Sequence, residues 1–297
     1  MDQPTWDLVA DLHALLQFHF MQNALVVGTL VAILAGAVGY FVVLRGQSFA
    51  AHMLSQVGFP GAAAAVLVHA PPVFGLMAFC VAAALGIGAM GRRFNAGNRL
   101  ESAAIGSILA FSLGLGLLFF RLFAGSAQGI YGFLFGTILG ITDRDVTVTA
   151  LTALAALLVV ALIGRPLLFS SVDPDVAEAR GVNVAGLALG FLLLVALTVA
   201  ITVQIVGTLL IFALLVAPGA CALQLTARPG RGVAITIALS LAFTWLGLSI
   251  AYFTIYPVGF FITSLAFATY VGIRVFNEVR AGALGPRRWA GFARVRP

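Results

Sequence analysis

The chain has no lysine and few charged side chains of either sign. Its 297 residues include 16 basic and 10 acidic side chains, together 9%, and every basic residue is an arginine. A soluble globular domain carries roughly 25% charged residues, so this deficit argues against an ordinary soluble enzyme or a nucleic-acid-binding domain. The phosphate-binding sequence GxxxxGK[ST] needs a lysine. The sequence therefore predicts that any ATP hydrolysis takes place on another subunit.

Cysteine is also scarce. Cys80 and Cys221 stand alone in separate apolar blocks, which excludes a disulfide framework and a CxxC metal site within the chain. We expect both to be packed or lipid-facing thiols. The first 19 residues contain three aspartates and no arginine. A signal peptide begins with basic residues, so no cleaved leader is expected.

Apolar residues dominate: 62% of the chain is hydrophobic, and its mean hydropathy is +1.10. About 20 apolar residues cross a bilayer as one helix. Two uncharged runs are too long for one crossing, and we expect 182–227 to divide near Gln204 and Gly207, and 232–273 at Tyr256 and Pro257. Five other runs fit one crossing each: 24–44, 49–68, 73–90, 102–120 and 146–164. The predicted fold is an all-α membrane bundle of about eight to nine transmembrane helices in a single domain, 1–297.

The arginines indicate the orientation of this bundle. They gather at 92–99, 165–180 and 228–231 and in the tail 274–297, and arginine is enriched in cytoplasmic loops. All four groups face the cytoplasm if the segment 129–141 does not cross the membrane. Residues 1–19 then form an extracytoplasmic lead-in. A basic tail suits the anionic inner surface of a bacterial plasma membrane.

One loop, 165–182, carries the signals of a short capped helix. A rigid helix at the inner face can pass a partner's motion to the bundle, although a simple capped connector would have the same signals. The sequence SSVDPDVAEARGV supplies an N-cap, a proline at the first helical position, acidic residues early, a basic residue late and a final glycine; these residues are Asp173, Pro174, Asp175, Glu178, Arg180 and Gly181.

Several segments together resemble the permeases of zinc and manganese ABC importers. The first is VVLRGQSFAAHMLSQVGFPGAAAA at 42–65, which is similar to the V-L-R, D-x-x-S-H and P-G signature of that family. Five more follow in the same order: SAAIGSILAFSLGLGLLF at 102–119, LFGTILGIT at 134–142, VDPDVAEARGV at 172–182, QIVGTLLIFALLVAPGACA at 204–222 and GLSIAYFTIYPVG at 247–259.

The resemblance implies a transport subunit with a type II ABC-importer fold, not an enzyme. It implies import of a divalent metal ion, with zinc as the preferred cargo and manganese or iron as the alternatives. No cofactor is expected to be stably bound, and ATP is expected only on a partner subunit. The implied partners are a second permease copy in a homodimer, a cytoplasmic ATPase dimer that grips the capped helix, and an extracytoplasmic metal-binding protein. The alternatives are an importer of a metal chelate or vitamin, and a stand-alone secondary transporter.

The resemblance also implies an ion path, at which this sequence departs from the family. Where the family has Asp and His four residues apart, this chain has His52 and Gln56, and Ser55 matches the family serine. A spacing of four keeps both side chains on one helix face, but the carboxylate is lost. The alternative for His52 is an ordinary interfacial histidine. Gln204, Gly207 and Pro218 are predicted to kink the helix beside the path, or to form a simple packing kink.

Overall fold

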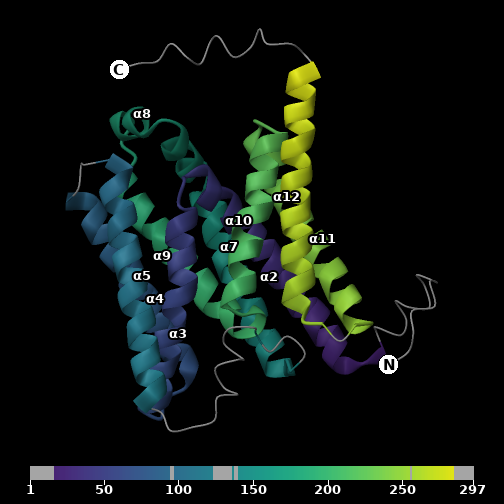
Figure 1. Cartoon of the computed structure of the whole chain (residues 1–297). Helices are drawn as coiled ribbons and strands as arrows, with labels where there is room; N and C mark the ends of the chain where they lie inside the picture. Colours follow the sequence, from purple (N-terminus) through teal and green to yellow (C-terminus); the bar gives the residue numbers. More distant parts are fainter. Residues whose placement is uncertain (1–16, 94–96, 123–135, 137–139, 255, 284–297) are drawn as a thin grey trace.

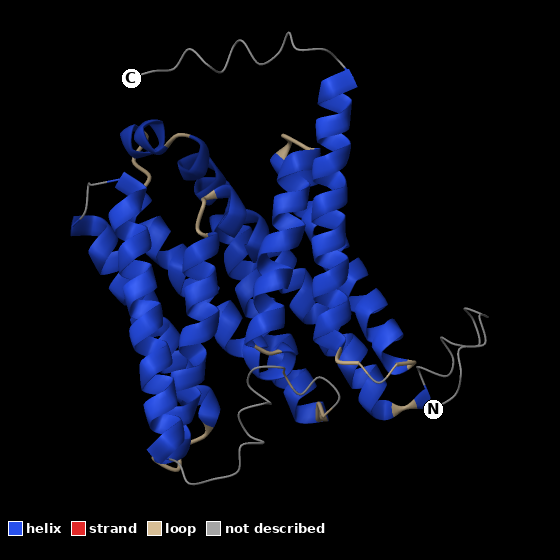
Figure 2. Cartoon of the chain, viewed as in Figure 1, coloured by secondary structure: helices blue, strands red, loops and turns tan. Residues whose placement is uncertain are grey.

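The computed structural model describes residues 17–93, 97–122, 136, 140–254 and 256–283. Within these ranges the chain is helical and has no strand (Figure 2). There are nine long helices and one short helix among the described residues: α2 (His19–Leu44), α3 (Ser48–Leu67), α4 (Pro72–Arg93), α5 (Gly97–Leu122), α7 (Asp143–Val172), α8 (Pro174–Ala179), α9 (Val184–Val206), α10 (Thr208–Leu225), α11 (Pro229–Tyr252) and α12 (Val258–Ala283).

Each predicted apolar run is occupied by one or two long helices. Seven of those described are long and apolar enough to cross a membrane, and α5 and α10 carry shorter apolar stretches. The run 182–227 is divided by Gly207 alone, whose φ of +88° favours glycine because it has no Cβ. The run 232–273 is divided between Tyr252 and Val258. The predicted all-α membrane bundle is therefore correct.

The two ends of the bundle differ in charge as expected. The turn between α2 and α3, the short helix α8, the α10–α11 connection and the last turns of α12 lie at one end (Figure 1). The end of α4 and the start of α5, which carry the arginines of the first group, also lie at that end, as do the groups at 165–180 and 228–231. Helix α5 ends and α7 begins at the opposite end (Figure 1). Most of the segment 129–141 and of the lead-in 1–19 lies outside the described residues.

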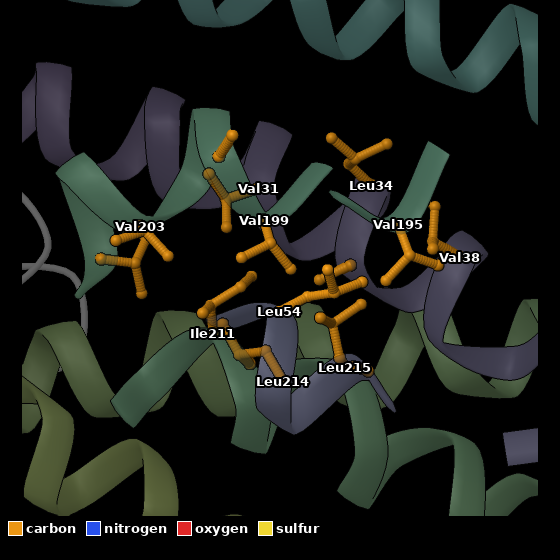
Figure 3. Packing of buried hydrophobic residues seen from close by; sticks show 14 of the residues in the cluster. Val31, Leu34, Val38, Leu54, Val195, Val199, Val203, Ile211, Leu214 and Leu215 are labelled. Atoms are coloured by element: carbon orange, nitrogen blue, oxygen red, sulfur yellow. The ribbon is translucent and has the colours of Figure 1, made fainter. Parts of the chain in front are cut away.

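Helices α2, α3, α9 and α10 meet in the centre of the bundle, where branched apolar side chains interlock (Figure 3). Lipid tails are as apolar as leucine, so helices in a membrane associate through close packing. A Cβ added to Gly39 of α2 would collide with the Leu215 carbonyl oxygen of α10, and one added to Gly219 would lie 2.9 Å from the Gly39 carbonyl oxygen. The backbones of α2 and α10 therefore touch. Cys80 and Cys221 are both buried.

Candidate functional site

His52 lies in the second turn of α3, facing α10. Its ring centroid is 4.6 Å from that of Phe212, with the two planes inclined at 63°. The side chain is half-buried, and its Nδ1 is buried without a hydrogen-bond partner among the described residues. A buried polar atom left unpaired costs about 1–3 kcal/mol. This nitrogen is therefore an unpaired polar atom at the contact between α3 and α10.

The structure separates the two other predicted path residues on α3. Gln56 is half-buried like His52, and its position one turn later places it on the same helix face. Ser55 is fully buried, and its hydroxyl donates a hydrogen bond of 2.7 Å to the His52 carbonyl oxygen. His52 and Gln56 thus share a face that leads out of the core, whereas Ser55 packs into it.

Helix α10, on the other side of this contact, has two irregular points. It begins directly after Gly207, and Pro218 lies inside it. Proline lacks an N–H, so the carbonyl of Leu214, one turn earlier, loses its helical donor. The backbone at Gln204 lies in the last turn of α9, next to this break. The predicted kink residues therefore lie at or beside real irregularities on the helix that contacts His52.

No group of three or more His, Cys, Asp or Glu side chains able to hold a metal ion occurs in the described part of the chain. His52 and Gln56 supply one nitrogen and one amide, and no carboxylate. A charged ion in a low-dielectric site needs opposite charge to be held tightly. The His52–Gln56 pair therefore lacks the compensating charge that would hold a divalent ion tightly.

The predicted capped helix is present as α8, and its boundaries are those expected. The Asp173 carboxylate accepts a hydrogen bond of 3.0 Å from the Val176 N–H, and Pro174 is the first helical residue. Gly181 has a φ of +84°, and bonds from Gly181 N–H to Glu178 O and from Val182 N–H to Ala177 O close the helix. Ala177 is buried, while Val176 and the charged residues Asp175, Glu178 and Arg180 are exposed. The helix therefore presents a firm, mixed apolar and charged surface.

Two polar clusters were not predicted from the sequence. At the α8 end, the Arg45 Nη1 donates hydrogen bonds to Ser170 Oγ (3.2 Å) and Ser171 Oγ (3.0 Å). Burial lowers the pKa of the Arg45 guanidinium because desolvation disfavours the charged form, yet arginine remains protonated in proteins. Pairing across more than 120 residues leaves no local sequence signal.

The second cluster ties α2 to the start of α7 at the opposite end. One carboxylate oxygen of Asp143 lies 2.8 Å from His19 Nε2 and accepts a 2.8 Å hydrogen bond from Asn23 Nδ2. Thr142 and Asp145 form a capping box at the same helix start. The capping box has a sequence signature, because a threonine is followed three residues later by an acid. The link to His19 has none.

Comparison with known proteins agrees with this architecture. The model of the ABC 3 transport family matches residues 17–277. The manganese transport system membrane protein MntC of Listeria monocytogenes is 32% identical over 241 residues, which are 81% of this chain and 85% of that protein. A probable iron transport system membrane protein of Haemophilus influenzae is 29% identical over 89% of this chain and 96% of its own length. The solved structure of PsaBC from Streptococcus pneumoniae in complex with Fab superposes with a TM-score of 0.79 at 29% identity, covering 89% of this chain and 94% of that chain.

The fold and these similarities define a multi-pass permease of a bacterial ABC importer, a plasma-membrane transport component and not an enzyme. The chain belongs to the ABC 3 transport family. It is a metal-importer permease. This family membership argues against two of the alternatives, an importer of vitamins and a stand-alone secondary transporter. The matched region includes both α3 and α8.

Proposed function

We propose that the imported ion is a divalent transition metal, with zinc preferred, and that His52 and Gln56 form its transit site. The observation that supports this most directly is the unpaired, buried Nδ1 of His52 beside Phe212. A neutral imidazole nitrogen suits zinc, whereas manganese prefers carboxylate oxygens. The relatives named above are manganese and iron proteins, so manganese is the competing cargo.

A transit site must release its ion as readily as it takes it up. The His52–Gln56 face contains no carboxylate, so each copy offers one good ligand and one weak one. We propose that two copies of the chain form a homodimer in which both His52 side chains contribute to one path. An extracytoplasmic metal-binding protein would then deliver the ion to the end of the bundle opposite α8.

Uptake of radioactive zinc by cells or proteoliposomes that contain the complete transporter tests this site. His52→Ala should lower the initial uptake rate about tenfold, equivalent to about 1.4 kcal/mol, without lowering the amount of protein in the membrane. Ser55→Ala is the matched control, because Ser55 lies on the same helix but faces the core, and it should keep nearly full uptake. Full uptake by the His52 variant would remove His52 from the path.

The same assay distinguishes the cargo. Excess unlabelled zinc should compete with labelled zinc more strongly than excess manganese does, if the imidazole nitrogen is the main ligand. Stronger competition by manganese would overturn the zinc assignment while leaving the role of His52 open to the first test.

We propose that α8 is the coupling helix on which a separate cytoplasmic ATPase docks. Support comes from its firm caps and from its surface, on which Val176 is 43% exposed between Asp175 and Glu178. A partly exposed apolar side chain flanked by charges is typical of the centre of an interface with a polar rim. Only Ala177 anchors this helix to the bundle through a buried side chain.

Copurification of the ATPase tests the docking role. Val176→Asp should reduce the amount of ATPase that copurifies with the chain by at least about tenfold, since a buried unpaired charge costs more than 1.4 kcal/mol. Val279→Asp introduces the same charge near the end of α12, where the side chain is also exposed, and should leave copurification intact. Unchanged copurification in the Val176 variant would place the ATPase elsewhere.

A further inference from the structure

Arg45 lies just before α3, the helix that carries His52, and its side chain bonds to the end of α7, just before α8. Among the described residues it is the only charged side chain that makes this connection. The guanidinium binds both Ser170 and Ser171 at the end of α7, and Asp173 follows two residues after Ser171. Asp173 is at once the last cap of α7 and the first cap of α8. The two serines are therefore joined to α8 by a short, capped connection.

The connection from Arg45 to His52 is equally short and firm. Helix α2 ends in bonds from Gly46 N–H to Val43 O (3.0 Å) and from Gln47 N–H to Val42 O (2.9 Å), with Gly46 at a φ of +68°. This pair of bonds is the glycine-dependent closure that fixes a helix end. Helix α3 then starts at Ser48, and His52 lies in its second turn. Moving Arg45 must therefore move the beginning of α3.

Ser170 and Ser171 hydrogen-bond both to the backbone and to Arg45. The donor and the acceptor of each of these hydrogen bonds can therefore be assigned. Ser170 Oγ donates to the Leu167 carbonyl oxygen at 3.1 Å, and Ser171 Oγ donates to the same oxygen at 2.5 Å. Each hydroxyl has one hydrogen, which is used for this bond, so its oxygen is free to accept from the guanidinium. The Arg45 carbon Cζ also lies 5.8 Å from the ring centre of Phe191 on α9, within range of a cation–π contact.

Two polar atoms at this joint, by which we mean the contact of Arg45 with Ser170 and Ser171 and the turn from α2 to α3, have no hydrogen-bond partner among the described residues. Arg45 Nε, a donor, and Gln47 Oε1, an acceptor, are both buried without a partner among the described residues. A buried polar group without a partner is unfavourable, so a second conformation that pairs either of them is stabilised. A joint with unused hydrogen-bonding groups is suited to exchange partners between two states of a transporter.

We propose that Arg45 is a positioning residue that transmits movement of α8 to α3, and so couples ATP hydrolysis to movement of the ion past His52. This inference rests on the proposed docking of an ATPase on α8 and on the proposed path at His52. It assigns to Arg45 no contact with either the ion or ATP. Its defining consequence is uncoupling: without the guanidinium, the ATPase still docks and hydrolyses ATP, but fewer ions move per ATP.

The test measures zinc uptake and ATP hydrolysis in proteoliposomes containing the chain and the ATPase that copurifies with it. Arg45→Gln should lower the ratio of zinc transported to ATP hydrolysed about tenfold while the ATPase still copurifies. Arg45→Lys keeps the charge but replaces the planar guanidinium by a compact ammonium on a flexible stem, so its ratio should fall between those of Arg45→Gln and the unaltered protein. Arg274→Gln removes an exposed arginine on α12 and should leave the ratio unchanged.

A purely structural role predicts a different pattern, in which transport and hydrolysis fall together and the ratio stays constant; that result would overturn the proposal. If Arg45→Gln fails to reach the membrane, the double variant Ser170→Ala, Ser171→Ala decides, since it removes the same contact and keeps the arginine. A normal ratio in that variant would also overturn it. If the unaltered protein shows no ATP-dependent uptake at all, the proposed function fails instead.

Discussion

Replacing Gly39 with alanine tests the backbone contact between α2 and α10, which positions Phe212 against His52. An added Cβ would collide with the carbonyl oxygen of Leu215, and a backbone oxygen cannot move aside as a flexible side chain can. Gly86 of α4 is the matched control, because a Cβ there meets no atom within 4 Å. Both substitutions add the same methyl group to a membrane helix.

The expected difference follows from two opposing effects. Alanine in place of glycine in a helix gains about 0.5–1 kcal/mol, and this gain applies at both positions. At Gly39 it is offset by overpacking, which costs about 1–3 kcal/mol. The Gly39 variant should therefore be about 1–3 kcal/mol less stable than the Gly86 variant. For a chain of this size that difference lowers the melting temperature by about 2–12 °C.

The two cysteines provide the assay. Cys80 and Cys221 are both fully buried, so a thiol-reactive dye labels them only when the bundle opens. Heating the purified chain with such a dye gives an apparent melting temperature for each variant. Equal melting temperatures for the Gly39 and Gly86 variants would show that α2 and α10 do not touch as described.

Three further predictions concern the proposed ion path and the proposed docking role of α8. Gln56→His adds a second imidazole on the face of His52, so zinc should bind more tightly and leave more slowly, seen as a lower KM and a lower maximal uptake rate. Pro218→Ala restores the helical donor for the Leu214 carbonyl, so the dye assay should show a higher melting temperature while uptake falls. Asp173→Ala removes the cap of α8, costs about 1 kcal/mol of helix stability, and should weaken copurification of the ATPase.

The helical architecture was predictable because a membrane leaves little choice. Backbone groups must pair within a segment, so the length of each uncharged run fixed the number and place of the helices. Local signals were equally reliable: Gly207 breaks its long run, and Asp173 caps α8 as expected. These features depend only on residues close together in the sequence and on the surrounding lipid or water.

The contacts between distant helices were not predictable. Nothing near Arg45 in the sequence indicates Ser170 and Ser171, since the pairing depends on how α2 and α7 end at the same height. The sequence also grouped Ser55 with His52 and Gln56, because it matches the family pattern. The structure places Ser55 in the core. Neighbouring residues of a helix point in different directions, so Ser55 faces away from the side of α3 that His52 and Gln56 share.

The distribution of rigid and irregular points indicates where the bundle can bend. At the α8 end of the bundle, glycine-closed turns follow Arg45 and Arg180, and α7 and α8 share the cap Asp173. Two helices of the bundle contain an internal proline, Pro60 in α3 and Pro218 in α10, and each proline removes one helical hydrogen bond. In the proposed coupling, a push on α8 therefore passes through the stiff contact at Arg45 to the start of α3. Pro60 follows His52 along α3, and Pro218 lies between Phe212 and the end of α10 on the α8 side, so both rings have a proline nearby at which their helix can bend. In the proposed transport cycle, bending at these prolines changes the contact between the rings of His52 and Phe212, past which the ion would move.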